Sequence, residues 1–550
     1  MKVNKIFKYT AAALCSMVVL TGCMKDIQPQ EGVITQEQLG LSEVGMDALL
    51  KGIPATIAAN YTSSIGEHTE FGYHSIGVHM DYAAQTITPC VTLVEGGNPY
   101  YSRFMLAQYG LGMNHNSGYT HFIWYNTYPN IKNCNDIIRT AGDDDFLREY
   151  RGIAKVYRAM MYLDLARYYE PMEAQAPELA GYTEALKSVY GLTVPIVDEN
   201  TTEEEAKNND RATREQMFEF IFADLADALE CLEGYNPVNA SYPTQAVVYG
   251  LYARAYLWLG GFEESASELV PVGEEAYRKA AEYARLAIET SGAPIMSESQ
   301  WCDPKTGFNS VVPSWMWASI MSTDTVLNNL YAFAAHMCPE AAYGYGPLSC
   351  PGVSKLSYER LSNTDFRKNL MVNPEFDYAR FKPYTQMSEA EFMALAPYTF
   401  FKFRPGQGER NDFMTANAIS LPLMRVEEMY FIEMQAMCHF DEATAWNKLY
   451  EFMSYRDSNY ACLTQDLVDE IIFQKTIEFW GEGQVMFDMK RLDIGVNTAY
   501  EGNNYPADGR FEIEGRLPWW NLPLPQGEMS VNVGIKENNP NPSGGYKPVV

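Results

Sequence analysis

The chain has 550 residues and a formal net charge of -29, from 41 basic and 70 acidic side chains. This charge repels phosphate backbones, so it argues against a nucleic-acid partner and favours a neutral or cationic ligand. The length allows one large body or more than one domain, and after the first twenty residues no apolar run reaches transmembrane length.

The start of the chain has the pattern of an export signal. Three lysines within the first eight residues precede an apolar stretch over residues 9–20, which is too short to span a bilayer as a helix. The run Leu20–Cys23 resembles the lipobox of bacterial lipoproteins, which implies cleavage after residue 22 and lipidation of Cys23. The alternative is an ordinary secretory signal that contains a cysteine. Residues 23–35 are polar and predict a flexible tether.

Residues 36–550 are expected to form the body. A first helix is predicted from about residue 47 to 63, followed by an irregular, aromatic-rich part over about 64–121 without sustained periodicity. Long loops on a rigid scaffold often carry binding residues. We therefore expect part of a ligand surface in this region.

Paired helices are expected over about 122–291, where apolar residues recur at helical spacing. The run Thr213–Gln216 fits a capping box. Ala246, Gly250 and Ala253 place small residues on one helical face, which allows close approach of a neighbouring helix. The predicted helices cover residues 122–139, 143–169, 213–233, 244–259 and about 277–291.

Prolines, glycines and tryptophans interrupt the helical pattern over about 295–421, which predicts an inserted, irregular part with short strands. Helices are expected again at 425–440, 443–456 and 467–482, followed by an extended tail. Antiparallel helix pairs of this kind are typical of tetratricopeptide-like repeats, although the period here is irregular. The predicted fold class is therefore mostly α, a helical-repeat scaffold with an inserted, loop-rich subdomain.

The cysteines show no metal-binding spacing. Cys231 and Cys438 lie in apolar helical patterns and are predicted to be buried thiols. A disulfide among Cys302, Cys338 and Cys350 is allowed in an oxidising compartment, and the sequence does not assign it.

Several separated blocks resemble the SusD/RagB family of outer-membrane lipoproteins. They occur in the family's order and extend from the lipobox to the tail. The blocks are Arg148–Tyr169 with Val194–Val197, Tyr252–Leu257 with Tyr283–Ile288, Pro422–Tyr430, Glu478–Arg491, Leu522–Pro525 and Asn538–Pro540. The chain departs from the family in the long insertion before Val194 and at Trp480-Gly481 and Gln484–Met486.

The resemblance implies a scaffold of tetratricopeptide-like units and a less regular half that carries the ligand surface. It also implies a partner, a SusC-like TonB-dependent outer-membrane transporter, and a cell-surface location in Bacteroidetes. The expected role is capture of a glycan and its delivery for import, without catalysis and without a cofactor. The alternatives are capture of a peptide or another nutrient and, less favoured, a surface glycoside hydrolase.

Two groups of residues allow other chemistry. Glu478 and Glu482 are four residues apart, as a carboxylate pair on one helical face would be, and glycosidases use such pairs. Their block also contains Lys490 and Arg491, so salt-bridged packing is the preferred interpretation. His74, His79 and Asp81 raise the question of a metal site, but the two histidines would lie on different helical faces. We therefore predict neither a catalytic residue nor a metal site.

Aromatic side chains in the irregular parts are the predicted ligand contacts. A sugar ring packs its C–H groups on a flat apolar face, and its hydroxyl groups need polar partners beside that face. An alternative for each residue is a structural role in the core. The predicted ligand-binding residues are Tyr73, Tyr82, Tyr101, Trp301, Tyr343 and Tyr345.

Overall fold

The computed structural model describes residues 43–58, 68–89, 118–173, 180–326 and 328–542. The chain divides into two compact units, one that ends at Asp47 and one that begins at Ala48. The predicted signal, the lipidation site Cys23 and the tether lie outside the described residues.

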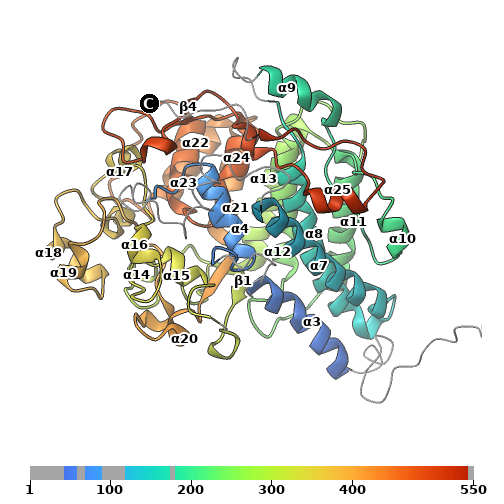
Figure 1. Cartoon of the computed structure of the whole chain (residues 1–550), viewed down its shortest axis with the longest axis horizontal. Helices are drawn as coiled ribbons and strands as arrows, with labels where there is room; N and C mark the ends of the chain where they lie inside the picture. Colours follow the sequence, from blue (N-terminus) through green and yellow to red (C-terminus); the bar gives the residue numbers. More distant parts are fainter. Residues whose placement is uncertain (1–42, 59–67, 90–117, 174–179, 327, 543–550) are drawn as a thin grey trace, which may run out of the picture. The chain divides into compact units, whose positions relative to one another are not determined.

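The unit from Ala48 onward is mostly helical, which confirms the predicted fold class. Its long helices pack in chain order, so that each helix contacts the next one in the series α7, α8, α11, α12, α13, α21 and α22. Figure 1 shows these helices side by side, with the less regular segment between α13 and α21 to their left. The arrangement is that of tetratricopeptide-like helical repeats, interrupted by one long insertion.

The helices of the repeat scaffold are α7 (Gly118–Ala141), α8 (Arg148–Tyr169), α11 (Arg214–Cys231), α12 (Gln245–Leu259), α13 (Gly273–Ser291), α21 (Val426–Met437), α22 (Glu442–Met453), α23 (Leu467–Glu478) and α24 (Val485–Leu492). Outside the scaffold the longer helices are α3 (Glu43–Ala58) and α4 (Tyr73–Ala83). The shorter helices are α9 (Ala180–Leu186), α10 (Glu203–Ala206), α14 (Glu298–Cys302), α15 (Phe333–Met337), α16 (Gly346–Ser349), α17 (Lys355–Arg360), α18 (Tyr378–Phe381), α19 (Glu389–Phe392), α20 (Phe413–Ala416) and α25 (Gln526–Val531). Single 3-10 turns connect several of them.

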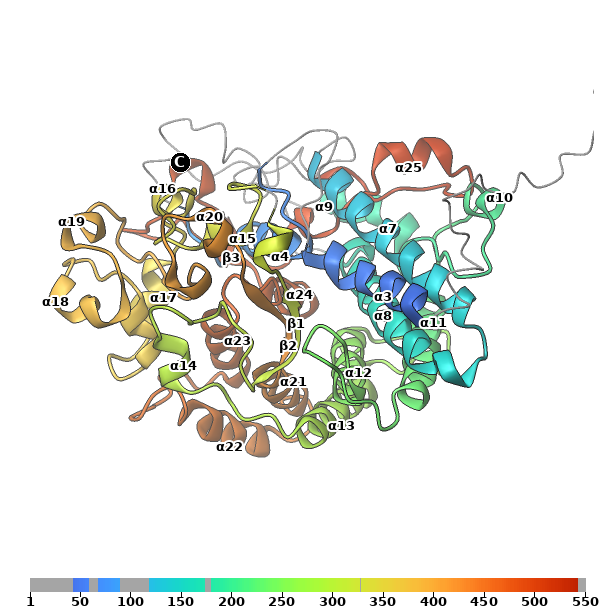
Figure 2. The same ribbon diagram turned by 90° about the horizontal axis from the view of Figure 1, so that it is seen from below.

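The inserted segment begins and ends on one pair of strands. β1 (Trp315–Ile320) pairs antiparallel with β2 (Ser420–Arg425), with Ala318 opposite Pro422 and Ile320 opposite Ser420. Figure 2 shows this pair between the scaffold helices and the short helices α14 to α20. A second pair, β3 (Val496–Asn497) with β4 (Glu512–Ile513), lies near the end of the chain. The expected short strands are therefore present.

Local sequence signals explain where the scaffold helices begin and end. The hydroxyl group of Thr213 accepts from the backbone N–H of Gln216, whose side chain accepts in turn from the Thr213 N–H, so the predicted capping box is confirmed. Gly292 ends α13 at a φ of 56°, a left-handed conformation that glycine adopts without cost.

The small residues of α12 leave space for side chains from neighbouring elements. A side chain at Gly250 would overlap the sulfur of Met424 on strand β2 and would lie 3.3 Å from the sulfur of Met429 on the neighbouring helix α21. The predicted close approach of a neighbouring helix is confirmed for α21, and a residue of strand β2 approaches the same glycine as well.

The irregular region after residue 64 contains a helix that the sequence pattern did not predict. α4 has eight buried residues, and polar side chains such as Ser75, His79 and Asp81 are among them rather than exposed on one face. A helix that is buried all round shows no amphipathic periodicity, which is why the pattern predicted a loop. At the other end of the scaffold, α23 stops at Glu478, four residues before its predicted end, and Gly481 and Gly483 follow with positive φ angles.

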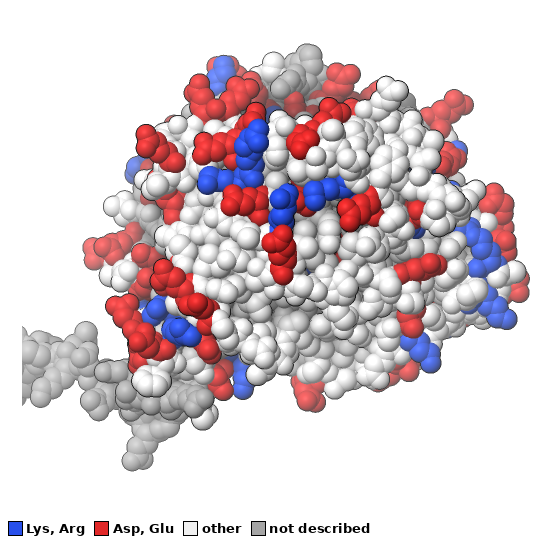
Figure 3. All heavy atoms as spheres, turned by 180° about the vertical axis from the view of Figure 1, so that it is seen from behind, with Lys and Arg blue, Asp and Glu red and all other residues white. Residues whose placement is uncertain are grey.

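Within the described ranges, no helix has the length and apolar character needed to cross a membrane. Cys231 is buried as expected, Cys438 is partly buried, and Cys302 and Cys338 carry free thiols. Figure 3 shows acidic and basic side chains interspersed on one face, with more acidic than basic groups and no large basic patch there.

Candidate functional site

Aromatic and amide side chains gather where three distant segments of the irregular half meet. The His68 ring packs edge-to-face on Tyr331, with 4.9 Å between ring centres. Tyr343 lies near Phe413, the first residue of α20, with 6.3 Å between ring centres. These four side chains are half-buried. We call them, together with the exposed Asn328 and Asn329, the aromatic shelf.

The buried Asn417 joins the two sides of the aromatic shelf. Its side-chain oxygen accepts from the hydroxyl group of Tyr343 at 2.6 Å. Its amide nitrogen donates to the backbone oxygens of Asn328 and Asn329, each at 3.1 Å. One amide group therefore fixes both the Tyr343 ring and the backbone that leads to Tyr331.

The buried His336 connects two of the same segments, because it contacts both His68 and Leu330. Its ring stacks on Phe71 at 4.9 Å, and its Nε2 lies 2.9 Å from the carbonyl oxygen of His68 and 3.0 Å from that of Leu330. Because both partners are carbonyl groups, Nε2 carries the hydrogen and donates. Burial lowers the pKa of His336 to about 4, so the ring is neutral at neutral pH.

The sequence-predicted ligand residues fall in different places. Tyr343 is part of the aromatic shelf, and the buried Tyr345 lies beneath it, with its hydroxyl group 2.5 Å from Nδ1 of His68. Tyr73 is on α4, and its hydroxyl group donates to Asp164 on α8 at 2.6 Å. Tyr101 lies outside the described residues.

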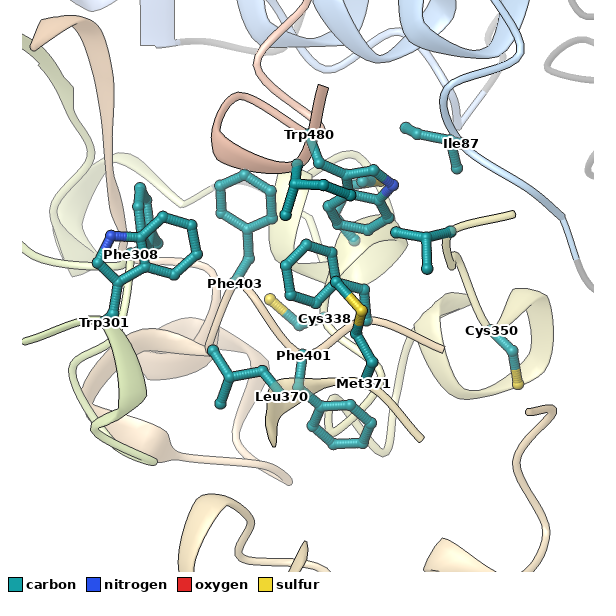
Figure 4. Close-up of a cluster of buried hydrophobic side chains, with 14 of the residues drawn as sticks. Ile87, Trp301, Phe308, Cys338, Cys350, Leu370, Met371, Phe401, Phe403 and Trp480 are labelled. Atoms are coloured by element: carbon teal, nitrogen blue, oxygen red, sulfur yellow. The ribbon is translucent and has the colours of Figure 1, made fainter. Parts of the chain in front are cut away.

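Tyr82 and Trp301 belong to the hydrophobic core of the irregular half. Trp301 is 0% exposed and packs edge-to-face on Phe308 at 4.5 Å, as Figure 4 shows together with Phe403 and Trp480. In this conformation the ring faces of Trp301 contact protein and not the surface. Ligand contact by the six predicted residues stays a prediction. Two of them, Tyr343 and Tyr345, lie together at the aromatic shelf.

Tyr343 is the one member of the aromatic shelf that the sequence predicted. The other members were not predicted, and neither was Asn417, which joins the two sides of the shelf. Tyr331 lies two residues after Asn329, and Phe413 directly follows Asn411 and Asp412, so each is close in sequence to polar residues in the segment already expected to bind ligand. An aromatic residue next to amide or carboxylate side chains in a loop was the available signal. The sequence does not show that segments hundreds of residues apart meet, as His68 and Tyr345 do.

The paired glutamates form part of a buried ion network. Glu478 is 0% exposed and accepts from Arg425 at 2.8 Å, from Arg456 at 2.9 Å and from Arg367 at 3.1 Å. Burial alone would raise the pKa of Glu478, but the three guanidinium groups hold it well below its usual value. A carboxylate that stays ionised cannot act as a general acid.

Glu482 is tied into the same network by Lys402 at 2.5 Å and Arg425 at 3.1 Å. The salt-bridge interpretation of the two glutamates is therefore confirmed. Their partners are distant in sequence and are not the nearby Lys490 and Arg491. Because α23 ends at Glu478, the two residues also do not share a helical face.

The side chains of His79 and Asp81 on α4 form hydrogen bonds with backbone groups of the protein. Nδ1 of His79 lies 2.7 Å from the carbonyl oxygen of Ser75, and the buried Asp81 accepts from the backbone N–H of Gly483 at 3.0 Å. Burial lowers the pKa of His74 to about 3. In the part of the chain that the structure describes, no three ligating side chains are grouped as a metal ion requires.

Comparison with known proteins points to one family. Residues 96–257 match a SusD-like family model described as starch-binding and associating with the outer membrane. No curated protein sequence matches the chain.

Solved structures match nearly the whole chain. A SusD-like carbohydrate-binding protein from Bacteroides vulgatus has 19% identity and a TM-score of 0.66 over 89% of this chain and 96% of its own. A SusD superfamily protein from Bacteroides thetaiotaomicron has 17% identity and a TM-score of 0.64 over 90% and 99%. Surface glycan-binding protein A from Bacteroides thetaiotaomicron, solved in complex with laminarihexaose, has 16% identity and a TM-score of 0.61 over 90% and 99%.

The helical scaffold, its inserted irregular half and these matches agree with one another. The resemblance to SusD-like proteins is thereby confirmed: residues 96–257 match a SusD-like family model, and the chain has the fold of the SusD superfamily.

Proposed function

We propose that this chain is a cell-surface lipoprotein that captures a glycan and delivers it to a SusC-like TonB-dependent transporter in the outer membrane. The observation that carries the proposal is the aromatic shelf, where two pairs of half-buried rings are linked through Asn417 to the backbone of two exposed asparagines. A sugar can pack its C–H face on such rings and bond its hydroxyl groups to the amides. The protein needs no catalytic residue for this role.

The chemistry of the aromatic shelf supports a neutral ligand. The imidazole beneath it is neutral, and the polar groups at its centre are amides and hydroxyl groups. The laminarihexaose complex of a protein with this fold, and the starch-binding description of the matching family model, agree with a carbohydrate ligand.

The proposed location rests on the start of the chain. The lipobox-like run Leu20–Cys23 supports lipidation of Cys23, and the family model is described as associating with the outer membrane. A lipid anchor and a flexible tether would keep the binding body close to its transporter, which raises its effective concentration at the entrance. Replacement of Cys23 by alanine should release the protein from the membrane fraction.

The test of glycan capture uses a soluble chain that begins at residue 24 and a panel of polysaccharides and oligosaccharides. We expect one glycan class to bind, and Tyr331→Ala and Tyr343→Ala each to weaken the binding at least about tenfold, which is about 1.4 kcal/mol. Tyr455→Ala is the matched control, because this tyrosine is 53% exposed and follows α22 on the helical scaffold. Isothermal titration calorimetry measures all three. A panel without any binder would exclude glycan capture.

The acidic balance of the chain keeps a second ligand class open. With a net charge of -29, the surface attracts cationic ligands, so a basic peptide is the alternative to a glycan. Binding of basic peptides that survives Tyr331→Ala would favour this alternative. The hydrolase alternative predicts turnover of a polysaccharide that disappears in Glu482→Gln, and the burial of Glu478 and Glu482 among cations argues against it.

A further inference from the structure

A small charged cavity lies inside the scaffold, where α8, α12, α21, α23 and α24 meet. Its volume is about 20 Å³. It shares no lining residue with the aromatic shelf, so any ligand of this cavity is independent of the proposed function. The charged side chains that line it are Arg167, Arg254, Lys475, Arg491, Glu428 and Asp488.

The two carboxylates of the cavity are already engaged. Glu428 accepts two hydrogen bonds from Arg254, both at 2.6 Å. Asp488 pairs with Lys475 at 2.7 Å and with Arg491 at 3.1 Å. Arg167, the remaining cation, pairs with Asp164 outside the lining. Four cations thus face three carboxylates, which leaves an excess of one positive charge in a region of low dielectric.

Two of the arginines also have donor groups without partners. Nη1 of Arg254 and Nε of Arg167 are buried and make no hydrogen bond to the protein. Arg254 is 3% exposed and Arg167 is 4% exposed. A guanidinium group stays charged in proteins and has no acceptor atom, so these N–H groups can be satisfied only by a ligand that accepts. Unpaired buried donors of this kind are costly, and proteins rarely retain them.

The size of the cavity restricts the ligand to a single atom-sized species. One water requires roughly 10–15 Å³, and this cavity offers about 20 Å³. Sulfate, phosphate and organic anions need more space than one water molecule, so a monatomic anion is the better fit. A halide ion fits the volume, accepts from several donors at once and neutralises the excess charge, whereas a water molecule leaves that charge in place.

We propose that this cavity is a binding site for one chloride ion, held between Arg167 of α8 and Arg254 of α12. The ion offsets the repulsion between the cations that α8, α12, α23 and α24 bring together. Its binding therefore stabilises the contact between α24 and the other scaffold helices. Because only the folded chain forms the site, chloride should raise the thermal stability of the protein.

The direct test replaces chloride by bromide in crystals of the soluble chain and measures anomalous scattering at the bromine edge. We expect one peak in the cavity within hydrogen-bonding range of Nη1 of Arg254. A normal water peak without anomalous signal, or no density at all, overturns the proposal.

A solution test uses the variant Lys475→Gln, which removes one cation and leaves Asp488 paired with Arg491. At constant ionic strength, exchange of gluconate for chloride should raise the Tm of the wild type by several degrees and that of Lys475→Gln by much less. Lys207→Gln is the matched control, since Lys207 is an exposed lysine paired with Glu203, and it should keep the full shift. An equal shift in all three proteins, or a shift without the bromide peak, counts against this site.

Discussion

Asp81 is a carboxylate that the fold buries without a full set of partners. Its Oδ2 accepts from the backbone of Gly483, whereas Oδ1 makes no hydrogen bond. Burial raises the pKa of Asp81 to about 7. The folded chain therefore holds a proton that the unfolded chain has already lost above about pH 4, so this residue costs stability as the pH rises from about 4 to about 7.

The Asp81→Asn variant should remove this cost. We expect its free energy of unfolding to exceed that of the wild type by more than about 1 kcal/mol at pH 8, and the difference to disappear near pH 4. The side-chain oxygen of asparagine can still accept from Gly483. Urea titrations across this pH range measure the effect. Asp145→Asn, at an exposed position, provides the control, and an Asp81→Asn profile parallel to that of the wild type would contradict the assignment.

At the scale of elements, α4 depends on a contact between two glycines. A side chain at Gly483 would overlap Cα of Gly77 on α4, and Gly483 also has a φ of 72°, which other residues adopt at a cost. The Gly483→Ala variant should therefore lose at least about 2 kcal/mol of stability. Chemical denaturation checks this, and hydrogen exchange should show the loss of protection in α4.

A second glycine provides the comparison. Gly181 lies in α9 with open space where a side chain would be, so Gly181→Ala should be neutral or stabilising by up to about 1 kcal/mol. If both variants were equally destabilised, the glycine contact would not be the reason.

Elements whose signals are local were predictable from the sequence. The scaffold helices from α7 to α22 show apolar periodicity, capping residues or terminal glycines, and each appears close to its expected bounds. α4 was not predictable, because polar residues are buried along with the apolar ones, so the helix lacks the pattern that marks a surface helix. The pairing of β1 with β2 joins residues about a hundred positions apart, and a single sequence shows no register for such a pair.

The type of residue in the candidate site could be predicted from the sequence, but most of the individual residues could not. The irregular segment and the aromatic residue type were expected, and Tyr343 belongs to both. Trp301 is an example of a residue that the sequence could not place. A tryptophan in a predicted loop region can lie in the core or on the surface, and its contacts with Phe308 and Phe366 show that this one lies in the core. Residues such as His68 and Asn417 become informative only when their three-dimensional partners are known.

At the scale of the whole unit from Ala48 onward, Glu478 links the two halves. Its carboxylate at the end of α23 pairs with Arg425 at the end of β2, with Arg456 after α22 and with Arg367 in the irregular half. Replacement by glutamine leaves three buried guanidinium groups without their common anion. We expect Glu478→Gln to lose about 3–5 kcal/mol, as is usual when one partner of a buried ion pair is removed.

Differential scanning calorimetry measures this loss and also shows whether both halves are affected. Because the network spans them, the variant should lower the Tm of the whole transition and not only of one part. Glu451→Gln, at an exposed position of α22, should leave the Tm unchanged. A variant Tm equal to that of the wild type would show that the network contributes little.

The strand pair β1–β2 has a consequence for how such proteins can diversify. Residues 321–419 leave the scaffold at one end of this pair and return at its neighbour, so the two ends of the segment are held about 5 Å apart whatever lies between them. Tyr331, Tyr343 and Phe413 of the aromatic shelf all belong to this segment. Its length and composition can therefore vary in evolution outside the positions that the scaffold depends on, such as Arg367 and Lys402, which pair with Glu478 and Glu482. If the aromatic shelf binds the ligand as proposed, changes in the loops that carry it alter ligand preference without altering the fold of the helical scaffold.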